Sequence, residues 1–134
     1  MDIGSLAFTV LSFAVALGVL VFVHELGHFA VAKRLKVLVQ RFSIGFGPVI
    51  FSRQRGETEY ALSAVPMGGY VKMLGEEDEE EARTNPDRAF STQPVWKRAS
   101  IVAAGPSMNF VFAFVAYAIL FTAAGATFYR SMRS

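Results

Sequence analysis

Residues 3–34 of this chain read IGSLAFTVLSFAVALGVLVFVHELGHFAVAKR, and this stretch decides the fold. Its first 21 residues, from Ile3 to Val23, carry no charge. A helix needs about 20 mainly apolar residues to cross the hydrocarbon core of a bilayer. The stretch therefore predicts a membrane-spanning helix, with two histidines and a glutamate near its end.

A secretory signal peptide is the alternative interpretation of this run. Ala14-Val15-Ala16 has the small residues of a cleavage site. However, Met1-Asp2 supplies none of the Lys or Arg that usually precede a signal peptide's apolar core, and the run continues past Ala16 to Val23. We therefore expect a retained helix.

A second charge-free run covers the 31 residues from Ala99 to Tyr129. As one helix it would extend about 46 Å, against a hydrocarbon core of about 30 Å. Proline disrupts the hydrogen-bond ladder of a helix and restricts the residue before it, so we expect Gly105-Pro106 to divide the run. The crossing is then expected at residues 107–128, with the start of the run along the interface or inside the protein.

The composition of the chain agrees with a membrane protein. Of its 134 residues, 53% are hydrophobic and 18% are charged, and the mean hydropathy is +0.39. A soluble domain typically carries about 25% charged residues, so an ordinary soluble protein is not expected. A net charge of +2, with no basic patch interleaved with aromatic residues, argues against nucleic acid as a partner. The absence of cysteine excludes disulfides, thiolate metal sites and cysteine nucleophiles.

The basic residues predict the orientation in the membrane. Eleven of the 13 Lys and Arg residues lie between the two apolar runs, and only Arg130 and Arg133 follow the second. By the positive-inside rule the connecting segment is cytoplasmic and both termini are outside. The expected fold class is an integral membrane protein, mainly α, with one transmembrane helix in residues 1–34 and a second, followed by an external tail, in residues 99–134.

The connecting residues 35–98 have the composition of a small, membrane-associated β-sheet. We expect three or four strands, because branched and aromatic residues gather in short runs that turn residues separate. The runs are residues 37–44, 49–51, 58–62 and 70–73, and the turns lie at residues 45–48 and 66–69. A short helix is expected at residues 85–90, and the acidic run at 76–81 is expected to be a solvated loop. Trp96-Lys97-Arg98 suits the membrane interface.

His24-Glu25-Leu26-Gly27-His28 is an HExxH sequence. Residues four apart share one face of a helix, so both imidazoles can reach one ion. Neutral imidazole is a good zinc ligand, and zinc lowers the pKa of bound water to about 7. Glu25 adjoins the first histidine and can act as general base toward that water. The pattern predicts metal-assisted hydrolysis, with a peptide bond as the expected substrate.

HExxH patterns also occur by chance, and the alternative here is a pair of helix-end histidines with a glutamate that reaches out to the interface. The position of the motif favours a zinc site. The chain has no other histidine, and Glu25 lies eight residues before Lys33, or about 12 Å along a helix. Ionisable residues at that depth cost several kcal/mol and mark functional sites.

Several motifs together resemble the N-terminal part of the site-2 protease family of intramembrane zinc metalloproteases. The residues that carry the resemblance are HELGH at 24–28, FGP at 46–48, PMGGYVKM at 66–73, Phe90 with PVWKR at 94–98, and GPSMNF at 105–110. The resemblance implies a metalloprotease of the bacterial inner membrane that cuts transmembrane segments of membrane proteins, with both termini in the periplasm. Its substrates would include an anti-sigma factor and signal-peptide remnants, within envelope-stress signalling.

The resemblance also implies roles for individual residues at the metal. His24 and His28 would bind Zn²⁺, and Glu25 would be the general base. Asn109 matches an asparagine on the family's second core helix that is linked to substrate handling. From the residues alone, a hydrogen bond between helices within the membrane is an equal alternative for Asn109.

A substrate-binding segment is implied as well. Residues 59–73, with Gly68, Gly69 and Tyr70, resemble a membrane-reentrant hairpin that presents substrate in extended form. The physical basis is strand addition, because a helical substrate must unwind before its peptide bond is exposed, and the edge of a sheet can hold it.

Two parts of the family's pattern are absent from this sequence. The third zinc ligand is an aspartate in a Leu-Asp-Gly type motif on a later helix, and PDZ domains follow the second core helix; neither occurs here. We therefore expect an N-terminal half, inactive alone, whose partner is a C-terminal half with the PDZ domains and the third ligand.

Two other functions stay open from the residues. One is a membrane zinc-handling or transport protein in which Glu25 is a ligand or a proton relay. A transporter would place polar residues along its helices, whereas Leu6 to Leu20 offers only Thr9 and Ser12. The other is a non-catalytic membrane adaptor whose sheet recruits partners.

Overall fold

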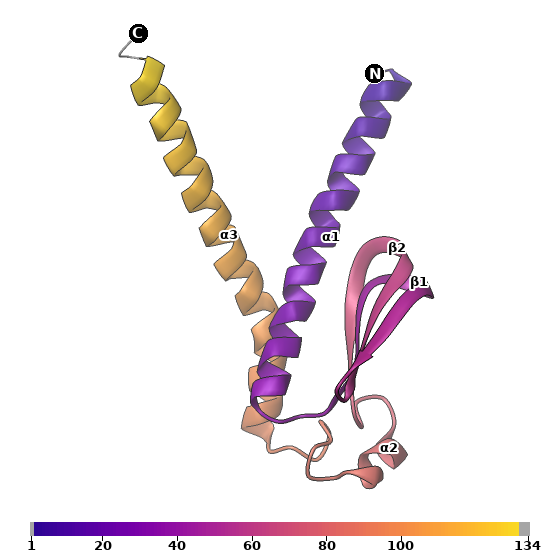
Figure 1. The fold of residues 1–134 in the computed structure, drawn as a ribbon. Coiled ribbons are helices and arrows are strands. Elements are labelled where there is room, and N and C mark those ends of the chain that lie inside the picture. Colours follow the sequence, from indigo (N-terminus) through magenta and orange to yellow (C-terminus); the bar gives the residue numbers. More distant parts are fainter. Residues whose placement is uncertain (1, 132–134) are drawn as a thin grey trace.

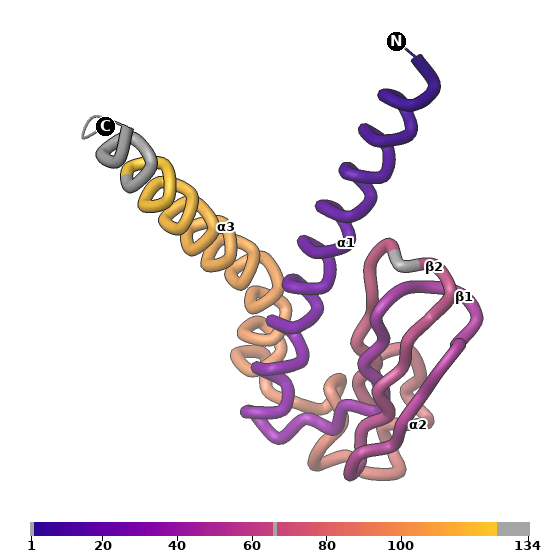
Figure 2. The backbone as a smooth tube through the Cα atoms, turned by 45° about the horizontal axis from the view of Figure 1, so that its top comes forward, coloured from indigo at the N-terminus to yellow at the C-terminus, as the bar shows by residue number. Residues whose placement is uncertain are grey.

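A computed structural model describes residues 2–131 of the chain, and the side chains of all of these except Pro66 and residues 126–131. The elements in chain order are α1 (Ile3–Arg34), β1 (Val39–Arg55), β2 (Thr58–Met73), α2 (Glu79–Thr84) and α3 (Val95–Ser131). The two long helices form a V that closes near the end of α1 and the start of α3 (Figure 1). The sheet lies beside α1, on the side away from α3 (Figures 1 and 2).

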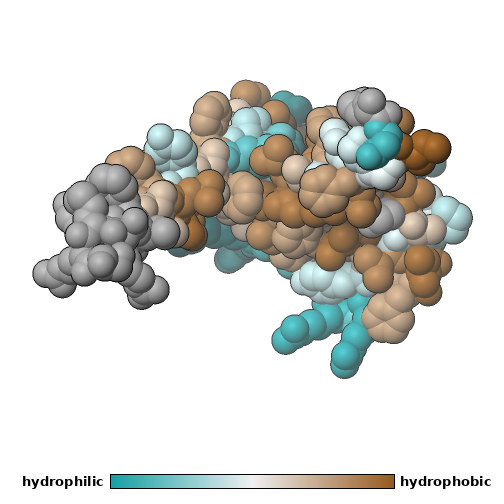
Figure 3. All heavy atoms as spheres, turned by 90° about the horizontal axis from the view of Figure 1, so that it is seen from above, coloured by the Kyte–Doolittle hydropathy of each residue, from teal (hydrophilic) through white to brown (hydrophobic). Residues whose placement is uncertain are grey.

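Both long helices are apolar and exposed. α1 is capped by Asp2, whose carboxylate accepts a hydrogen bond from the backbone N–H of Ser5 at 2.6 Å, and its last turn carries Lys33 and Arg34, which suit the negative end of a helix dipole. α1 and α3 are long and apolar enough to cross a membrane, and none of either hydrophobic window is buried within the protein. From the open end of the V, hydrophobic side chains dominate the described surface (Figure 3).

α3 differs from the prediction at Gly105-Pro106, because one helix runs through this pair instead of ending there. Pro106 offers no N–H to the carbonyl of Val102, four residues earlier. The turn is supported in two other ways. The Ser107 hydroxyl donates to the Ala103 carbonyl at 2.7 Å, and the neighbouring turns pack against α1. The predicted external tail beyond Ser131 lies outside the described residues.

The sheet consists of two long bent strands. β1 and β2 form an antiparallel pair joined by a turn at Gly56, and both bend, so that residues 41–44 pair with residues 59–62 on one side and with residues 69–72 on the other. Segments thus lie side by side in the order 69–73, 39–44, 58–63, 49–55. The three or four short strands predicted from sequence are segments of these two. The predicted turns are bends within the strands, where Gly45, Gly47 and Gly68 adopt positive φ.

The short helix lies earlier than predicted. Residues 85–90 form no helix, whereas α2 occupies the end of the acidic run that was expected to be a loop. Asp78 caps α2 by accepting a hydrogen bond from the N–H of Glu80 at 2.8 Å. Acidic side chains in the first turn of a helix are favoured by its dipole, so a run of carboxylates can begin a helix as well as fill a loop.

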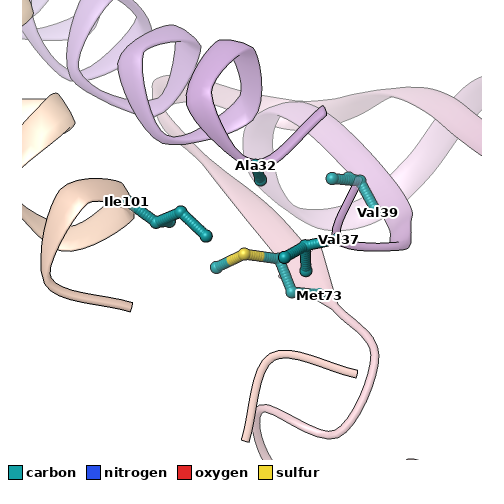
Figure 4. Packing of buried hydrophobic residues seen from close by; sticks show 5 residues of the cluster. All are labelled: Ala32, Val37, Val39, Met73 and Ile101. Atoms are coloured by element: carbon teal, nitrogen blue, oxygen red, sulfur yellow. The ribbon is translucent and has the colours of Figure 1, made fainter. Parts of the chain in front are cut away.

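A small core closes the base of the V. Ala32, Val37, Val39, Met73 and Ile101 are each at most 4% exposed and pack together (Figure 4). They come from the end of α1, the connection between α1 and β1, the start of β1, the end of β2 and the start of α3. This cluster therefore fixes both long helices and the sheet relative to one another at the level of the HExxH motif.

Candidate metal centre

The two histidines of the motif lie on one face of α1, as their spacing predicts. Their ring centroids are 4.8 Å apart, and the rings are nearly perpendicular. Both Nε2 atoms point to Gly105 of α3. A Cβ atom on Gly105 would lie 2.6 Å from Nε2 of His24 and closer still to Nε2 of His28. The two nitrogens thus converge on one small space that exists because residue 105 has no side chain.

A second glycine brings α3 this close to the motif. A Cβ on Gly27 would meet the backbone carbonyl of Ala104 and would lie 3.0 Å from Cβ of Met108. Gly27 is buried, and the obstacle is backbone, which cannot rotate away as a flexible side chain can. Gly27 and Gly105 therefore set the close approach of the two helices.

The Nδ1 atoms of both histidines also contact groups on α3. Nδ1 of His28 lies 2.7 Å from the carbonyl oxygen of Ile101. Because a carbonyl only accepts, Nδ1 of His28 carries the proton, and Nε2 keeps its lone pair for a metal. Nδ1 of His24 lies 3.3 Å from the side-chain amide nitrogen of Asn109.

The amide of Asn109 completes the same arrangement at His24 when it is turned by half a rotation. Its Oδ1 is buried and has no hydrogen-bond partner as placed. The half-turn exchanges Oδ1 and Nδ2, so that Nδ1–H of His24 donates to Oδ1 and Nε2 is left free for a metal. In this orientation the buried oxygen accepts a hydrogen bond, and Nε2 of His24 is available to a metal.

Glu25 faces the sheet. The end of β2 passes its side chain: a Cβ on Gly69 would lie 3.8 Å from Cγ of Glu25, and the backbone N–H of Val71 interacts with the carboxylate. A pocket of about 310 Å³ opens here, and its lining residues are Glu25, His28, Val71, Met73, Glu76, Phe90, Ile101 and Val102. The candidate base thus borders a space next to one candidate ligand.

Glu76 brings a second carboxyl group to this pocket. It accepts a hydrogen bond from the backbone N–H of Met73 at 3.2 Å. Burial raises the pKa of Glu76, against the opposing effect of that hydrogen bond.

Two of the four predicted substrate-binding residues lie beside the HExxH motif and two do not. Gly69 lies beside Glu25 and Asn109 contacts His24, as described above. Gly68 packs under the ring of Phe46 with φ of 108°. The hydroxyl of Tyr70 accepts a hydrogen bond from the Arg41 guanidinium at 3.1 Å. The described contacts of Gly68 and Tyr70 thus support the sheet and do not reach the motif.

The model of peptidase family M50 matches residues 12–133, a span that contains every residue of this site. The chain belongs to peptidase family M50. A putative zinc metalloprotease of Ralstonia nicotianae is 52% identical over 121 residues, which are 84% of this chain and 26% of that protein. The regulator of sigma-E protease of Escherichia coli is 51% identical over 111 residues, which are 82% of this chain and 25% of that protein.

A third M50 relative, a putative zinc metalloprotease of Brucella suis, is 44% identical over 128 residues, which are 87% of this chain and 34% of that protein. The chain therefore spans about a quarter to a third of the length of these curated relatives. Membership of the M50 family confirms the resemblance to the site-2 protease family found in the sequence.

The residues present fit zinc as the metal of an M50 peptidase. Two imidazole Nε2 atoms converge, the Nδ1 of His28 is held by a carbonyl, and Gly105 leaves room between the rings. Among residues 2–131, no group of three or more His, Cys, Asp or Glu side chains could hold a metal. Catalytic zinc takes three protein ligands, and the described part of the chain offers two candidates, His24 and His28.

Sequence reasoning missed two residues of α3, Ile101 and Gly105, that border the candidate metal centre. Ile101 was assigned only to the start of the second apolar run, and Gly105 only to the expected break at Gly105-Pro106 and to the GPSMNF motif. With Asn109 they are spaced by four residues, which places all three on one helical face. That spacing was a usable signal, because His24 and His28 are also four apart.

Proposed function

We propose that the chain is the N-terminal catalytic part of an intramembrane zinc metalloprotease, which hydrolyses peptide bonds within transmembrane segments of membrane proteins. The observation that carries the proposal is the convergence of two histidine Nε2 atoms on Gly105, with Glu25 bordering a pocket beside them. Membership of peptidase family M50 supports the reaction class.

In this proposal each polar group of the motif has one task. His24 and His28 bind Zn²⁺ through Nε2. Zinc bound there would act as a Lewis acid and lower the pKa of water to about 7. Glu25 accepts the proton of the attacking water and passes it to the leaving amine. Asn109 orients His24 through Nδ1, as the carbonyl of Ile101 orients His28.

The substrate would bind at the edge of the sheet. Residues 69–73 form an outer segment of the sheet and run past Glu25. A transmembrane helix keeps its peptide bonds inside its own hydrogen-bond ladder, so it must unwind before hydrolysis. An unwound segment can add to residues 69–73 as a further strand beside the candidate base. Gly68 and Tyr70 would support this edge.

The proposal places the site inside the bacterial inner membrane. α1 and α3 would span it with both termini in the periplasm, and residues 35–98 would lie on the cytoplasmic side. Apolar side chains at the bends of the sheet, which are Ile44, Phe46, Val49, Ile50 and Phe51, are 40–69% exposed. Such a patch suits insertion into lipid, as in a membrane-reentrant hairpin.

The proposal extends to partners outside this chain. Because the chain spans only a quarter to a third of its relatives' length, a C-terminal half with the third zinc ligand and PDZ domains is proposed to complete the enzyme. Alone, the chain would be inactive. The name of the Escherichia coli relative, regulator of sigma-E protease, supports a role in the regulation of sigma-E. An anti-sigma factor and signal-peptide remnants are the substrates proposed here, within envelope-stress signalling.

The test is cleavage of a tagged transmembrane substrate in proteoliposomes by the chain together with its proposed C-terminal half. We expect Glu25→Gln to lower the cleavage rate by about 10² to 10⁴ with zinc content unchanged, because glutamine cannot accept the proton. His28→Ala should lose zinc. Glu77→Gln, at an exposed position outside the site, is the matched control.

Two results would contradict the protease. Near-normal cleavage by Glu25→Gln would show that Glu25 is not the base, and loss of zinc from that variant would make Glu25 a ligand. Zinc movement into the liposomes without cleavage would favour the transport alternative. The absence of both cleavage and zinc movement would favour the adaptor.

A further inference from the structure

A basic pocket lies at the base of the V, away from the candidate metal centre. Its volume is about 470 Å³, and its lining residues are Lys33, Leu35, Lys36, Glu57, Asp87, Arg88 and Lys97. Four of these side chains are cationic and two are carboxylates, so the pocket carries an excess of two positive charges. They come from the end of α1 and the two residues after it, the turn between β1 and β2, the segment before α3, and the first turn of α3.

Glu57 neutralises only part of this charge. Both oxygens of Glu57 accept hydrogen bonds from the Arg88 guanidinium at 2.7 Å, and Lys33 donates to Glu57 at 3.0 Å. The hydrogen bonds from Arg88 and Lys33 lower the pKa of Glu57 to about 2, so Glu57 stays ionised. Nε of Arg88 also donates to the carbonyl of Lys36 at 3.1 Å, which holds the Lys36 backbone at φ of 62°.

Two of the cations keep their charge available. Among the described residues, neither Lys36 nor Lys97 forms an ion pair. The ammonium of Lys97 donates to the neutral amide oxygen of Gln93 at 3.0 Å. An ammonium bonded to a neutral acceptor retains its full charge for an anion.

An apolar surface begins at the rim of the pocket. The ring of Trp96 lies 5.9 Å from the ammonium of Lys97. Trp96 is 60% exposed, and Val95 and Val102 on the same helix are 71% and 59% exposed. A ligand with an anionic head and apolar chains would contact both the basic pocket and the apolar surface beside it. A free anion would contact only the pocket.

We propose that this pocket binds the phosphodiester headgroup of an anionic phospholipid, with the acyl chains along the exposed face of α3. The proposal rests on the membrane placement of the proposed function, in which the pocket lies at the cytoplasmic leaflet. Anionic lipids enrich that leaflet, and basic pockets beside transmembrane helices bind their headgroups. Lys36 and Lys97 contact the phosphate, and Glu57 sets the net charge of the pocket.

The single tryptophan of the chain provides the measurement, because Trp96 lies at the rim. Brominated lipid quenches tryptophan fluorescence on contact. The 134-residue chain in mixed micelles is titrated with brominated phosphatidylglycerol, and separately with brominated phosphatidylcholine. We expect quenching by the anionic lipid to be about 25-fold tighter, because the pocket has two net positive charges and each contributes about fivefold.

Three variants test the assignment of residues. Lys36→Gln and Lys97→Gln should each weaken the preference for anionic lipid about fivefold. Glu57→Gln should strengthen it, because Lys33 and Arg88 lose their counter-ion; general damage to the fold would weaken it instead. Arg83→Gln, which removes a positive charge from an exposed side chain on α2, is the matched control and should change nothing.

The outcomes that overturn the proposal are distinct. An unchanged preference in both lysine variants would remove the pocket as the site, and displacement of the lipid by millimolar inorganic phosphate would assign it to a free anion. Equal quenching by both lipids would refute headgroup recognition while leaving the protease proposal intact, because that is tested by cleavage. No quenching by either lipid would contradict the membrane placement on which both depend.

Discussion

Replacement of Gly105 by alanine tests whether the two imidazoles converge as the structure has them. Ordinary van der Waals contact begins at about 3.4 Å, whereas the new Cβ would lie 2.6 Å from Nε2 of His24 and closer to Nε2 of His28. Each ring must therefore retreat by about 0.8 Å or more. Neither can do so freely, because Nδ1 of His28 is tied to the carbonyl of Ile101 and Nδ1 of His24 lies against Asn109.

The expected result of Gly105→Ala is a loss of zinc affinity of about 10- to 100-fold, the range found when residues that orient metal ligands are changed. Cleavage should fall further, because a misplacement of about 1 Å can cost about 10²-fold in rate. Helix content should hold, since alanine favours a helix over glycine by about 1 kcal/mol. Zinc affinity is measured by competition with a chromophoric chelator, with the chain joined to its proposed C-terminal half.

The same helix offers a matched control. A Cβ on Gly125 would meet no atom within 4 Å, so Gly125→Ala makes the same chemical change on α3 in open space. It should leave zinc affinity at the original value. Zinc affinity within threefold of the original in Gly105→Ala, with helix content intact, would refute the convergence of the two Nε2 atoms on residue 105.

Three further predictions concern the orientation of a ligand, topology and pH. Asn109→Leu should lower zinc affinity about 10- to 100-fold, whereas Asn109→Asp should retain it, because an aspartate can still accept from Nδ1 of His24. Zinc affinity is measured by chelator competition. If Asn109→Leu binds zinc as tightly as the unchanged chain, Asn109 keeps a role in substrate handling only. A cysteine in place of Glu80 should be labelled only from the cytoplasm, and labelling from outside intact cells would reverse the topology. The hydrogen bond from Arg88 is the main reason why the pKa of Glu57 is lowered from its ordinary value of 4.5 to about 2. The ionised Glu57 carboxylate therefore stabilises the fold fully above about pH 4.5, and this stabilisation is lost as the pH falls toward 2. Allowing for solvent screening of this partly exposed carboxylate, the free energy of unfolding should fall by about 1 kcal/mol over that range, and chemical denaturation of Glu57→Gln should show no such fall.

Local patterns in the sequence predicted most of the secondary structure. Charge-free runs predict the two long apolar helices, because length and hydropathy are properties of a continuous segment. The HExxH spacing places His24 and His28 on one face, because helical periodicity is local. The positive-φ glycines Gly45, Gly47 and Gly68 lie at the predicted turns for the same reason. Where two local rules competed, prediction failed: Pro106 did not end α3, and the acidic run begins α2 because Asp78 caps it.

The sequence by itself thus determined the two apolar helices, the existence of a sheet between them and the face of α1 that carries the motif. Only the tertiary structure decided what that face meets. Ile101 and His28 are 73 positions apart in the chain and Asn109 and His24 are 85 apart, yet each pair is in contact. Their meeting depends on the angle and depth at which α3 crosses α1, which two glycines and the small core at the base of the V set together. No single segment encodes that geometry, because it arises from packing between segments that are remote in sequence.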